Sequence, residues 1–89
     1  MKSFRQLERI VRGFSNHRRI QLLDLLSRQP DLSVNEITLK VGSRFRPISE
    51  HLRRMAIAGL VLKRNEGRSV RHSLTRRGES ILKFVRTLS

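Results

Sequence analysis

Residues 43–55 read SRFRPISEHLRRM. An apolar line runs through this stretch and consists of Phe45, Ile48, Leu52 and Met55. Because a helix advances about 100° per residue, these side chains would share one face, while the four arginines and Glu50 would lie opposite or on the flanks. We predict a helix over residues 46–58 with one packed side. Its basic side is either an ordinary solvated face or a face that reads a nucleic acid.

The charge of the chain indicates a polyanionic partner. The 89 residues carry a net charge of +13, and sixteen of the twenty basic residues are arginine. Guanidinium forms planar bidentate hydrogen bonds with phosphate and guanine that lysine does not form. Residues 43–77 hold ten Lys or Arg against two Glu, which concentrates the positive charge in the second half of the chain. With four Phe and neither Tyr nor Trp to stack on single-stranded bases, double-stranded DNA is the expected partner.

Glycine and proline divide the chain into short segments, of which the first four have helical periodicity. A first helix is expected over residues 3–13, and a second follows a cap at Ser15 or Asn16 and ends by Pro30. The capping box of Ser33 and Glu36 starts the third helix, which stops at Gly42. Pro47 suits the first turn of the fourth helix, and Gly59 closes it.

After Gly59 the periodicity changes from 3.6 to 2. Residues 60–64 and 70–74 alternate around a polar stretch and are expected to form a β-hairpin. A last helix is expected over residues 76–88, capped by Thr75. The predicted fold is a single domain, residues 1–89, that is mainly α with a small β-hairpin. This order of about five helices and a two-stranded wing is a winged helix-turn-helix, with the helix-turn-helix at about 33–59 and the wing at about 60–74.

Three motifs resemble the ArsR-like family of bacterial and archaeal repressors. The first is SNHRRIQLLDLL at 15–26, which resembles the family's GDPTRLRILRLL. The second is ISEHLRRMAIAGLV at 48–61, which resembles the family's VSRHLKVLREAGLV. The third is EGRSVRHSL at 66–74, which resembles the family's EGRWVYYRL. The resemblance spans residues 7–75. It implies a winged helix-turn-helix regulator that pairs through its first and last helices.

The resemblance also assigns roles to individual positions. Ser49 and His51 match the Ser and His of the family's recognition helix, and Gly67 and Arg68 match its wing tip. The segment DLSVNEI at 31–37 resembles ELCVCEL, which binds thiophilic metals in the metal-sensing members. Ser and Asn replace both cysteines here, and they are poor ligands for soft metals. Glu50 stands where the family has Arg, and it would either repel phosphate or accept a hydrogen bond from cytosine.

Two sets of candidate residues follow. The expected DNA-binding residues are Arg44, Arg46, Pro47, Ser49, Glu50, His51, Arg53, Arg54, Lys63, Arg64, Arg68 and Arg71. The apolar stripes of the terminal helices predict a homodimer interface through Phe4, Leu7, Val11, Phe14, Ile81, Val85 and Leu88, unless these stripes close over their own core. Ile57 also points outward on the fourth helix, and we assign it no role.

Other sites are not expected. The sequence shows no catalytic motif, cofactor motif or small-molecule site, and its three histidines have no metal-ligand spacing. The lack of cysteine fits a reducing interior, and no apolar run is long enough for a membrane helix, so we expect a cytoplasmic, nucleoid-associated protein. The leading hypothesis is a sequence-specific transcription regulator, a dimeric repressor. The alternatives are an architectural DNA-binding protein with little sequence preference, and a winged helix that binds RNA or a protein.

Overall fold

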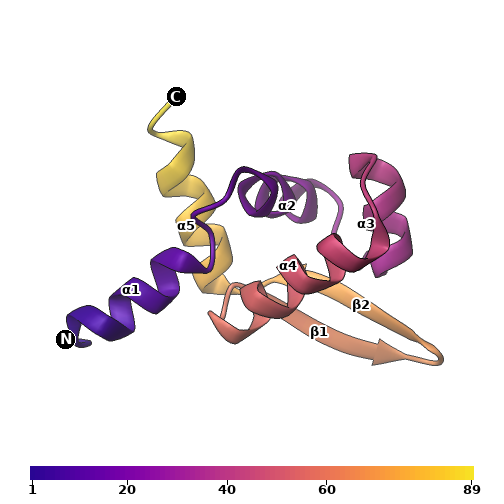
Figure 1. Cartoon of the computed structure of the whole chain (residues 1–89), viewed down its shortest axis with the longest axis horizontal. Helices are drawn as coiled ribbons and strands as arrows, with labels where there is room; N and C mark the ends of the chain where they lie inside the picture. The colour runs from indigo at the N-terminus through magenta and orange to yellow at the C-terminus, as the bar shows by residue number, and fades with distance from the viewer.

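The computed structural model describes all of residues 1–89 as five helices and a two-stranded antiparallel hairpin (Figure 1). The elements in chain order are α1 (Phe4–Arg12), α2 (His17–Arg28), α3 (Val34–Val41), α4 (Phe45–Ile57), β1 (Val61–Glu66), β2 (Ser69–Leu74) and α5 (Arg76–Arg86). This order confirms the predicted fold class. None of the five helices combines the length and the apolar character that crossing a membrane requires.

Side chains at the helix starts explain where the helices begin. Ser3 and Ser33 each form a capping box, with Gln6 and Glu36 respectively. The side chain of Asn16 accepts two backbone N–H groups from the first turn of α2. These bonds satisfy donors that a helix leaves unpaired at its N-terminus. The predicted starts of the first three helices are therefore confirmed, and each depends on residues close together in the sequence.

Helix α2 is the centre of the core and lies between the other elements (Figure 1). Four of its leucines are buried: Leu22, Leu23, Leu25 and Leu26. Thirteen buried apolar residues form one cluster, to which α3, α4, the start of β1 and α5 also contribute. This small core holds α3 and α4 in their relative orientation and fixes the root of the hairpin.

The hairpin is longer, and its turn tighter, than the sequence indicated. The polar stretch at 65–68 predicted a loop, but the strands remain paired as far as Glu66 and Ser69. Only Gly67 and Arg68 form the loop. Gly67 has φ 62°, which is typical of the first position of a type II′ turn and which glycine adopts without strain. Polar side chains suit an exposed ribbon end, so composition alone predicted a loop where the backbone pairing continues.

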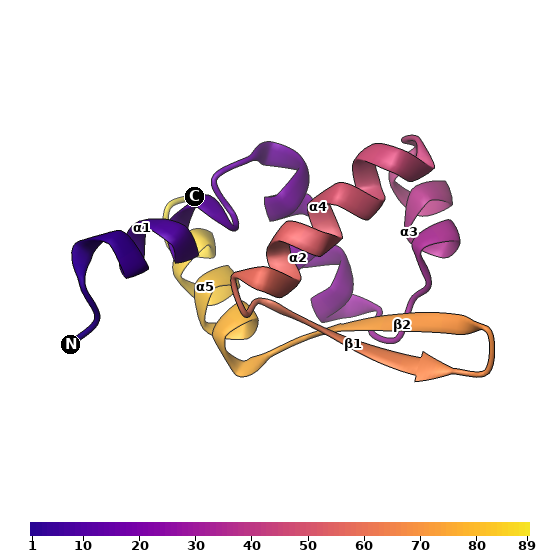
Figure 2. The same cartoon turned by 60° about the horizontal axis from the view of Figure 1, so that its bottom comes forward.

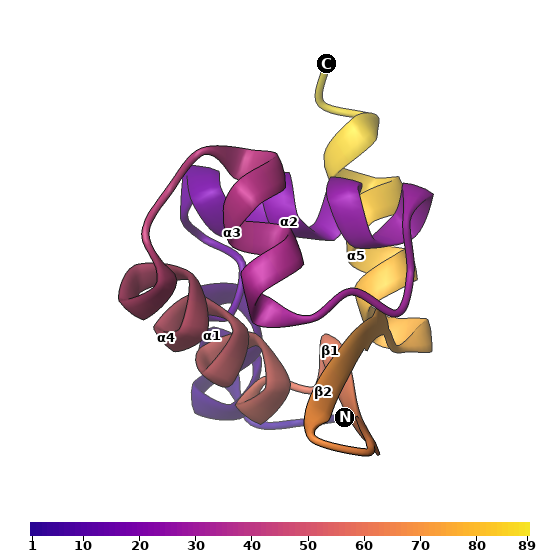
Figure 3. The same ribbon diagram turned by 90° about the vertical axis from the view of Figure 1, so that its right-hand side faces the viewer.

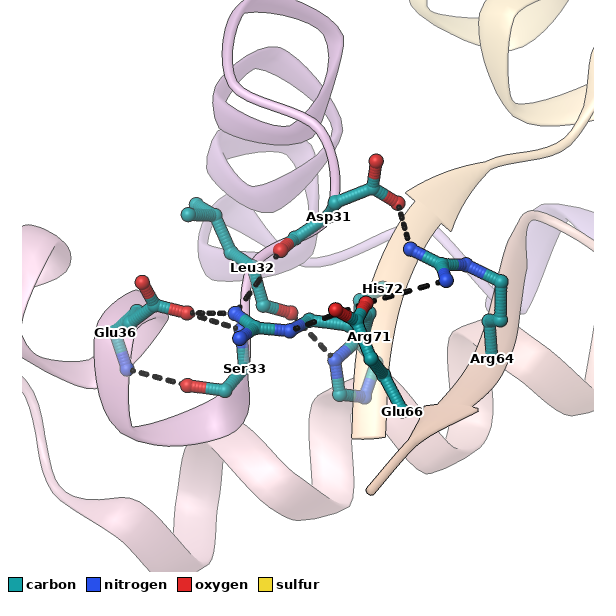
Figure 4. Close-up of polar contacts among 8 residues, drawn as sticks. All are labelled: Asp31, Leu32, Ser33, Glu36, Arg64, Glu66, Arg71 and His72. Carbon is teal, nitrogen blue, oxygen red and sulfur yellow. Dashed lines mark hydrogen bonds and ion pairs between the residues drawn. The ribbon is translucent and has the colours of Figure 1, made fainter. Parts of the chain in front are cut away.

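A one-residue bridge joins the loop before α3 to the middle of β2 (Figure 4). The backbone N–H of His72 donates to the carbonyl of Leu32 at 2.9 Å, and the N–H of Asp31 donates to the carbonyl of His72 at 2.9 Å. The His72 ring is buried, with its Nδ1 also 2.9 Å from the Leu32 carbonyl. Because a carbonyl only accepts, Nδ1 carries the proton. His72 thus packs under the hairpin and fixes it to the segment before α3.

Helix α1 differs from the other four because none of its residues is buried. It extends away from the body of the molecule at the end opposite the hairpin tip (Figures 1 and 2). The chain comes close to the body just after α1, at Gly13. A Cβ atom there would collide with the side chain of Ala58 at the end of α4, so this approach requires glycine.

We predict that His72 contributes to a loss of stability in mild acid. Burial lowers the pKa of His72, so the folded protein keeps the ring neutral at a pH where the unfolded chain takes up a proton. The unfolded pKa is about 6.5. The stabilisation is therefore complete above that value and is lost as the pH falls toward the lower folded pKa. Urea unfolding at a series of pH values from about 7.5 to about 5 measures this loss.

Two variants separate this effect from general acid sensitivity. His72→Gln should be less stable at neutral pH and should show a shallower loss of unfolding free energy with acid. His17→Gln, at an exposed position in the first turn of α2, should retain the wild-type pH dependence. An unchanged acid dependence in His72→Gln would contradict the assignment.

Candidate nucleic-acid interface

The packed side of α4 determines which of its residues face solvent. Ile48, Leu52 and Met55 are fully buried, as predicted. The prediction that Phe45 shares this packed face is wrong, because its side chain is 51% exposed. Phe45 is the first residue of α4 and precedes the part of the helix that reaches the core. The outward side of α4 is left to polar and basic residues, together with Ile57, which is 73% exposed as expected.

Four arginines occupy this exposed side: Arg44, Arg46, Arg53 and Arg54. Arg44 is the N-cap residue of α4, and Arg46 lies in its first turn. Neither is in an ion pair, whereas Arg53 and Arg54 both pair with Glu50. The N-terminal end of the second helix is where helix-turn-helix proteins reach base edges. The two unpaired guanidinium groups thus lie at the end of α4 that would approach a groove.

Glu50 holds the other two arginines along the side of α4. Its Oε1 and Oε2 accept hydrogen bonds from Arg53 at 2.6 and 3.1 Å, and Oε1 also accepts one from Nε of Arg54 at 3.1 Å. The hydrogen bond from Arg53 lowers the pKa of Glu50, so this carboxyl is ionised at neutral pH. Glu50 therefore orients two guanidinium groups and compensates one of their two charges, a role that its position in the sequence did not reveal.

His51 is held in place by α2. Arg19 donates from Nε to Nδ1 of His51 at 3.0 Å, and burial followed by the charge of Arg19 lowers the pKa of His51. Because Nδ1 accepts, the neutral ring carries its proton on Nε2. Ser49 is half-buried and Pro47 is exposed on the same helix. Arg19 was missing from the sequence prediction, since it lies 32 residues from its partner in another helix.

The four basic residues predicted on the wing divide into two pairs. Arg64 and Arg71 face each other across the strands, and like charges in this position repel. Carboxylates compensate them: Arg64 pairs with Asp31 and Glu66, and Arg71 pairs with Glu66 and, at 2.6 Å, with Glu36 (Figure 4). The Arg71 side chain is only 29% exposed.

The other wing pair, Lys63 and Arg68, is exposed and takes part in no ion pair. Arg71 therefore fastens the hairpin to α3 rather than projecting from it. No spacing in the sequence indicates the contact with Glu36, because Glu36 lies 35 residues from Arg71.

The N-terminal end of α4 and the hairpin tip lie at the same end of the molecule, away from α1 (Figures 1 and 2). Helices α3 and α4 cross next to each other, with the hairpin beside α4 (Figure 3). Arg46 and Arg68 thus belong to one end of the protein, which also carries the unpaired Arg44. No three His, Cys, Asp or Glu side chains gather there or elsewhere in a way that would hold a metal ion.

The seven residues predicted to form a dimer interface differ in exposure. Phe4 is 82% exposed, and Val11 and Leu88 are 49% and 69% exposed. Leu7 is exposed as well, and Val85 is half-buried. Phe14 and Ile81 are partly buried against the protein's own core. The terminal helices therefore leave an apolar surface uncovered, concentrated on one side of α1 and at the end of α5.

No protein-family model matches the sequence, and no curated protein matches it. Solved structures do match. Mb0332 from Mycobacterium bovis, a homodimeric winged helix-turn-helix DNA-binding domain and possible ArsR-family transcriptional regulator, superposes with a TM-score of 0.84 and is 26% identical. The match covers 99% of this chain and 87% of Mb0332.

Two further regulators show the same likeness. The transcriptional regulator HlyU from Vibrio vulnificus CMCP6 is 29% identical, with a TM-score of 0.76 over 92% of this chain and 85% of HlyU. An ArsR-like transcriptional regulator from Rhodococcus sp. RHA1 is 26% identical, with a TM-score of 0.78 over 96% of this chain and 75% of its own. The resemblance to ArsR-like winged helix-turn-helix regulators is confirmed. All three are described as transcriptional regulators, Mb0332 as a possible one.

We predict that Glu50→Gln strengthens binding to random-sequence duplex DNA by roughly threefold or more, because it removes a negative charge and releases two arginines toward phosphate. The affinity of the variant should also fall more steeply as salt is raised. Fluorescence anisotropy over a salt series measures both effects. Glu79→Gln on α5 removes the same charge far from this face and should leave the affinity near that of the wild type. Weaker binding by Glu50→Gln would contradict the prediction.

Proposed function

We propose that this chain is a homodimeric transcription regulator that binds double-stranded DNA, with α4 in the major groove and the hairpin on the backbone or minor groove. One observation carries the proposal. A helix-turn-helix holds the N-terminal end of α4 outward, and that end carries two arginines, Arg44 and Arg46, with no carboxylate to compensate them. The likeness to winged helix-turn-helix DNA-binding domains supports it.

The structure suggests different roles for the basic residues. Arg44 and Arg46 are free to form bidentate bonds with guanine, each worth about 1 to 3 kcal/mol in discrimination. Ser49 lies on the next turn. Arg53 and Arg54 are held sideways by Glu50 and are better placed for phosphates flanking the groove. At the hairpin, the uncompensated Lys63 and Arg68 supply the contacts to the backbone or minor groove.

Dimerisation would bring two copies of α4 onto one DNA site. The uncovered apolar side of α1 and the end of α5 supply a surface for a second copy, and the structural relative Mb0332 is homodimeric. A two-fold dimer requires half-sites about one helical turn apart in a pseudo-palindrome. A dimer occupying such a site would exclude other proteins from it, so we propose that the protein acts as a repressor.

Selection of binders from random duplex DNA tests the proposal. At physiological salt the recovered sequences should share a motif with two-fold symmetry, and the affinity for it should exceed that for random duplex by roughly 10³ or more. Arg46→Gln should reduce the preference at one base pair in each half-site. Recovery of unrelated sequences, with equal affinity for all, would overturn sequence recognition and favour an architectural protein, which the net charge of +13 would also serve.

The dimer makes a separate prediction. Phe4→Asp combined with Val11→Asp should weaken self-association by about 30-fold or more, because both positions lie on the uncovered side of α1. Helical content should persist in the other helices, since α1 contributes nothing to the core. Leu39→Asp is the matched control, because Leu39 is 83% exposed on α3. Sedimentation velocity over a range of concentrations measures the change. Unaltered association of the double variant would place the interface elsewhere.

A further inference from the structure

A hollow of about 590 Å³ lies between α1, the C-terminal half of α4 and the start of α5. Seven of the twelve residues that line it are Lys or Arg, and none is Asp or Glu. Lys2, Arg9 and Arg12 come from the N-terminal segment and α1, and the other four come from α2, α4 and α5. This end of the molecule is opposite the hairpin tip (Figure 2). The hollow thus gathers positive charge from four separate parts of the chain.

Two arginines of the hollow are fixed by neutral acceptors. Arg19 donates to the ring of His51 at 3.0 Å and to the carbonyl of Arg12 at 2.8 Å. Arg77 donates to the carbonyl of Ala58 at 2.9 Å. Neutral acceptors hold a guanidinium in position without cancelling its charge. Burial lowers the pKa of Arg19, and the nearby charge of Arg54 lowers it further.

Nearby carboxylates compensate only part of this charge. Glu8 lies 3.6 Å from Arg12, and Glu50 pairs with Arg53 and Arg54. Setting these two acids against the seven basic residues leaves five positive charges around one hollow. A small number of fixed cations around a concave site suits a ligand with several negative charges close together.

The hollow also has an apolar wall. Ile10, Ile57 and Ala58 line it together with the basic residues. Ile57 is 73% exposed and has no packing role in the core. The volume falls within the range of about 300 to 1,000 Å³ that is typical of small-molecule sites. An apolar wall beside a cluster of cations matches a ligand that has an apolar or aromatic body and a strongly anionic end.

We propose that this hollow binds a soluble polyphosphate ester of the nucleoside triphosphate class, with its phosphates on Arg9, Arg12, Arg19 and Arg77 and its base against Ile57. The DNA backbone is a less suitable occupant. A duplex presents phosphates along a convex rod, and it has no apolar group at phosphate level to meet Ile10 and Ile57. The sequence showed no small-molecule site, because the lining residues come from positions 2 to 77.

Part of the α1 wall of the hollow faces away from the proposed dimer surface. A helix advances about 100° per residue. On α1 this places the lining residues Gln6 and Arg9 roughly opposite the apolar residues Phe4, Leu7 and Val11. A partner that covers the apolar side therefore leaves Gln6 and Arg9 accessible, whereas Ile10 and Arg12 lie between the two sides.

The site would regulate DNA binding, an effect that rests on the proposed function. Arg53 and Arg54 line the hollow and are also candidates for phosphate contacts on DNA. A polyphosphate bound between α1 and α4 would attract both side chains and neutralise their charge. The ligand and DNA would then compete for the same two arginines, so each would weaken the binding of the other by the same factor.

Calorimetric titration of the full-length protein with ATP, at about 150 mM salt and without divalent cations, tests the site. ATP should bind saturably with one site per chain, and adenosine should not bind detectably. Arg9→Gln combined with Arg12→Gln should weaken ATP binding roughly tenfold or more. The control, Arg5→Gln combined with Arg76→Gln, removes the same charge from outside the hollow and should change the affinity less than about twofold. Circular dichroism confirms that both variants fold.

Three results would overturn the proposal. One is the absence of saturable ATP binding, and another is an equal loss in the two double variants, which would indicate diffuse charge attraction. The third is normal ATP binding by the Arg9→Gln and Arg12→Gln double variant together with weaker binding to duplex DNA than the control double variant shows. That result would make the hollow a site for the DNA backbone. ATP titration needs no DNA, so a failure of DNA binding and a failure of this site are distinguishable.

Discussion

The burial of Ile48, Leu52 and Met55 in the core fixes the orientation of α4, and the rest of the structure depends on it. These residues lie one helical turn apart and set the rotation of α4 about its own axis. Truncating a residue buried in this way costs about 2 to 5 kcal/mol, a large part of the stability of a small domain. The hairpin follows directly, because the backbone N–H of Leu60 donates to the carbonyl of Met55. The packed side of one helix therefore decides what the outward side presents and where the wing begins.

Ion pairs with carboxylates divide the basic side chains into a paired group and an unpaired group. Glu50 holds two arginines on α4, and Glu36 with Glu66 fixes Arg71 of the hairpin against α3. Asp24 pairs with Arg28 and Arg86 and so links α2 to α5. Most of the few acidic residues thus have a structural function. The exposed cations without an ion pair lie on the N-terminal segment and α1, on α3, on the N-terminal end of α4, on the hairpin and on α5.

Sequence patterns predicted the parts of the fold that depend on neighbouring residues. The capping box of Ser33 and Glu36, the leucines of α2 and the glycine at position 42 are local signals, and the corresponding helices occur where expected. Phe45 fitted the apolar periodicity but lies beyond the reach of the core. The outward face of α4 was predictable for the same reason as the helix itself, because periodicity determines which residues are left outside.

Tertiary pairings could not be predicted in this way. The partners of Arg71 and His51 come from other elements, and no spacing in the sequence indicates them. The hollow beside α1 was missed for the same reason, since its cations come together only when the chain has folded. Glu50 was recognised as unusual, but its role depends on side-chain rotamers that a sequence does not specify.

In the proposed dimer, helix α1 makes the protein depend on its own concentration. A helix of nine residues with nothing buried is marginal in water, so contacts from a second copy would stabilise it. In the proposed dimer those contacts come from the second copy, and mass action then links the folding of α1 to the amount of protein present. On dilution of the dimer, α1 would become mobile, and the hollow would lose the wall that α1 forms. The abundance of the protein would thereby set both its assembly and its capacity to hold a ligand.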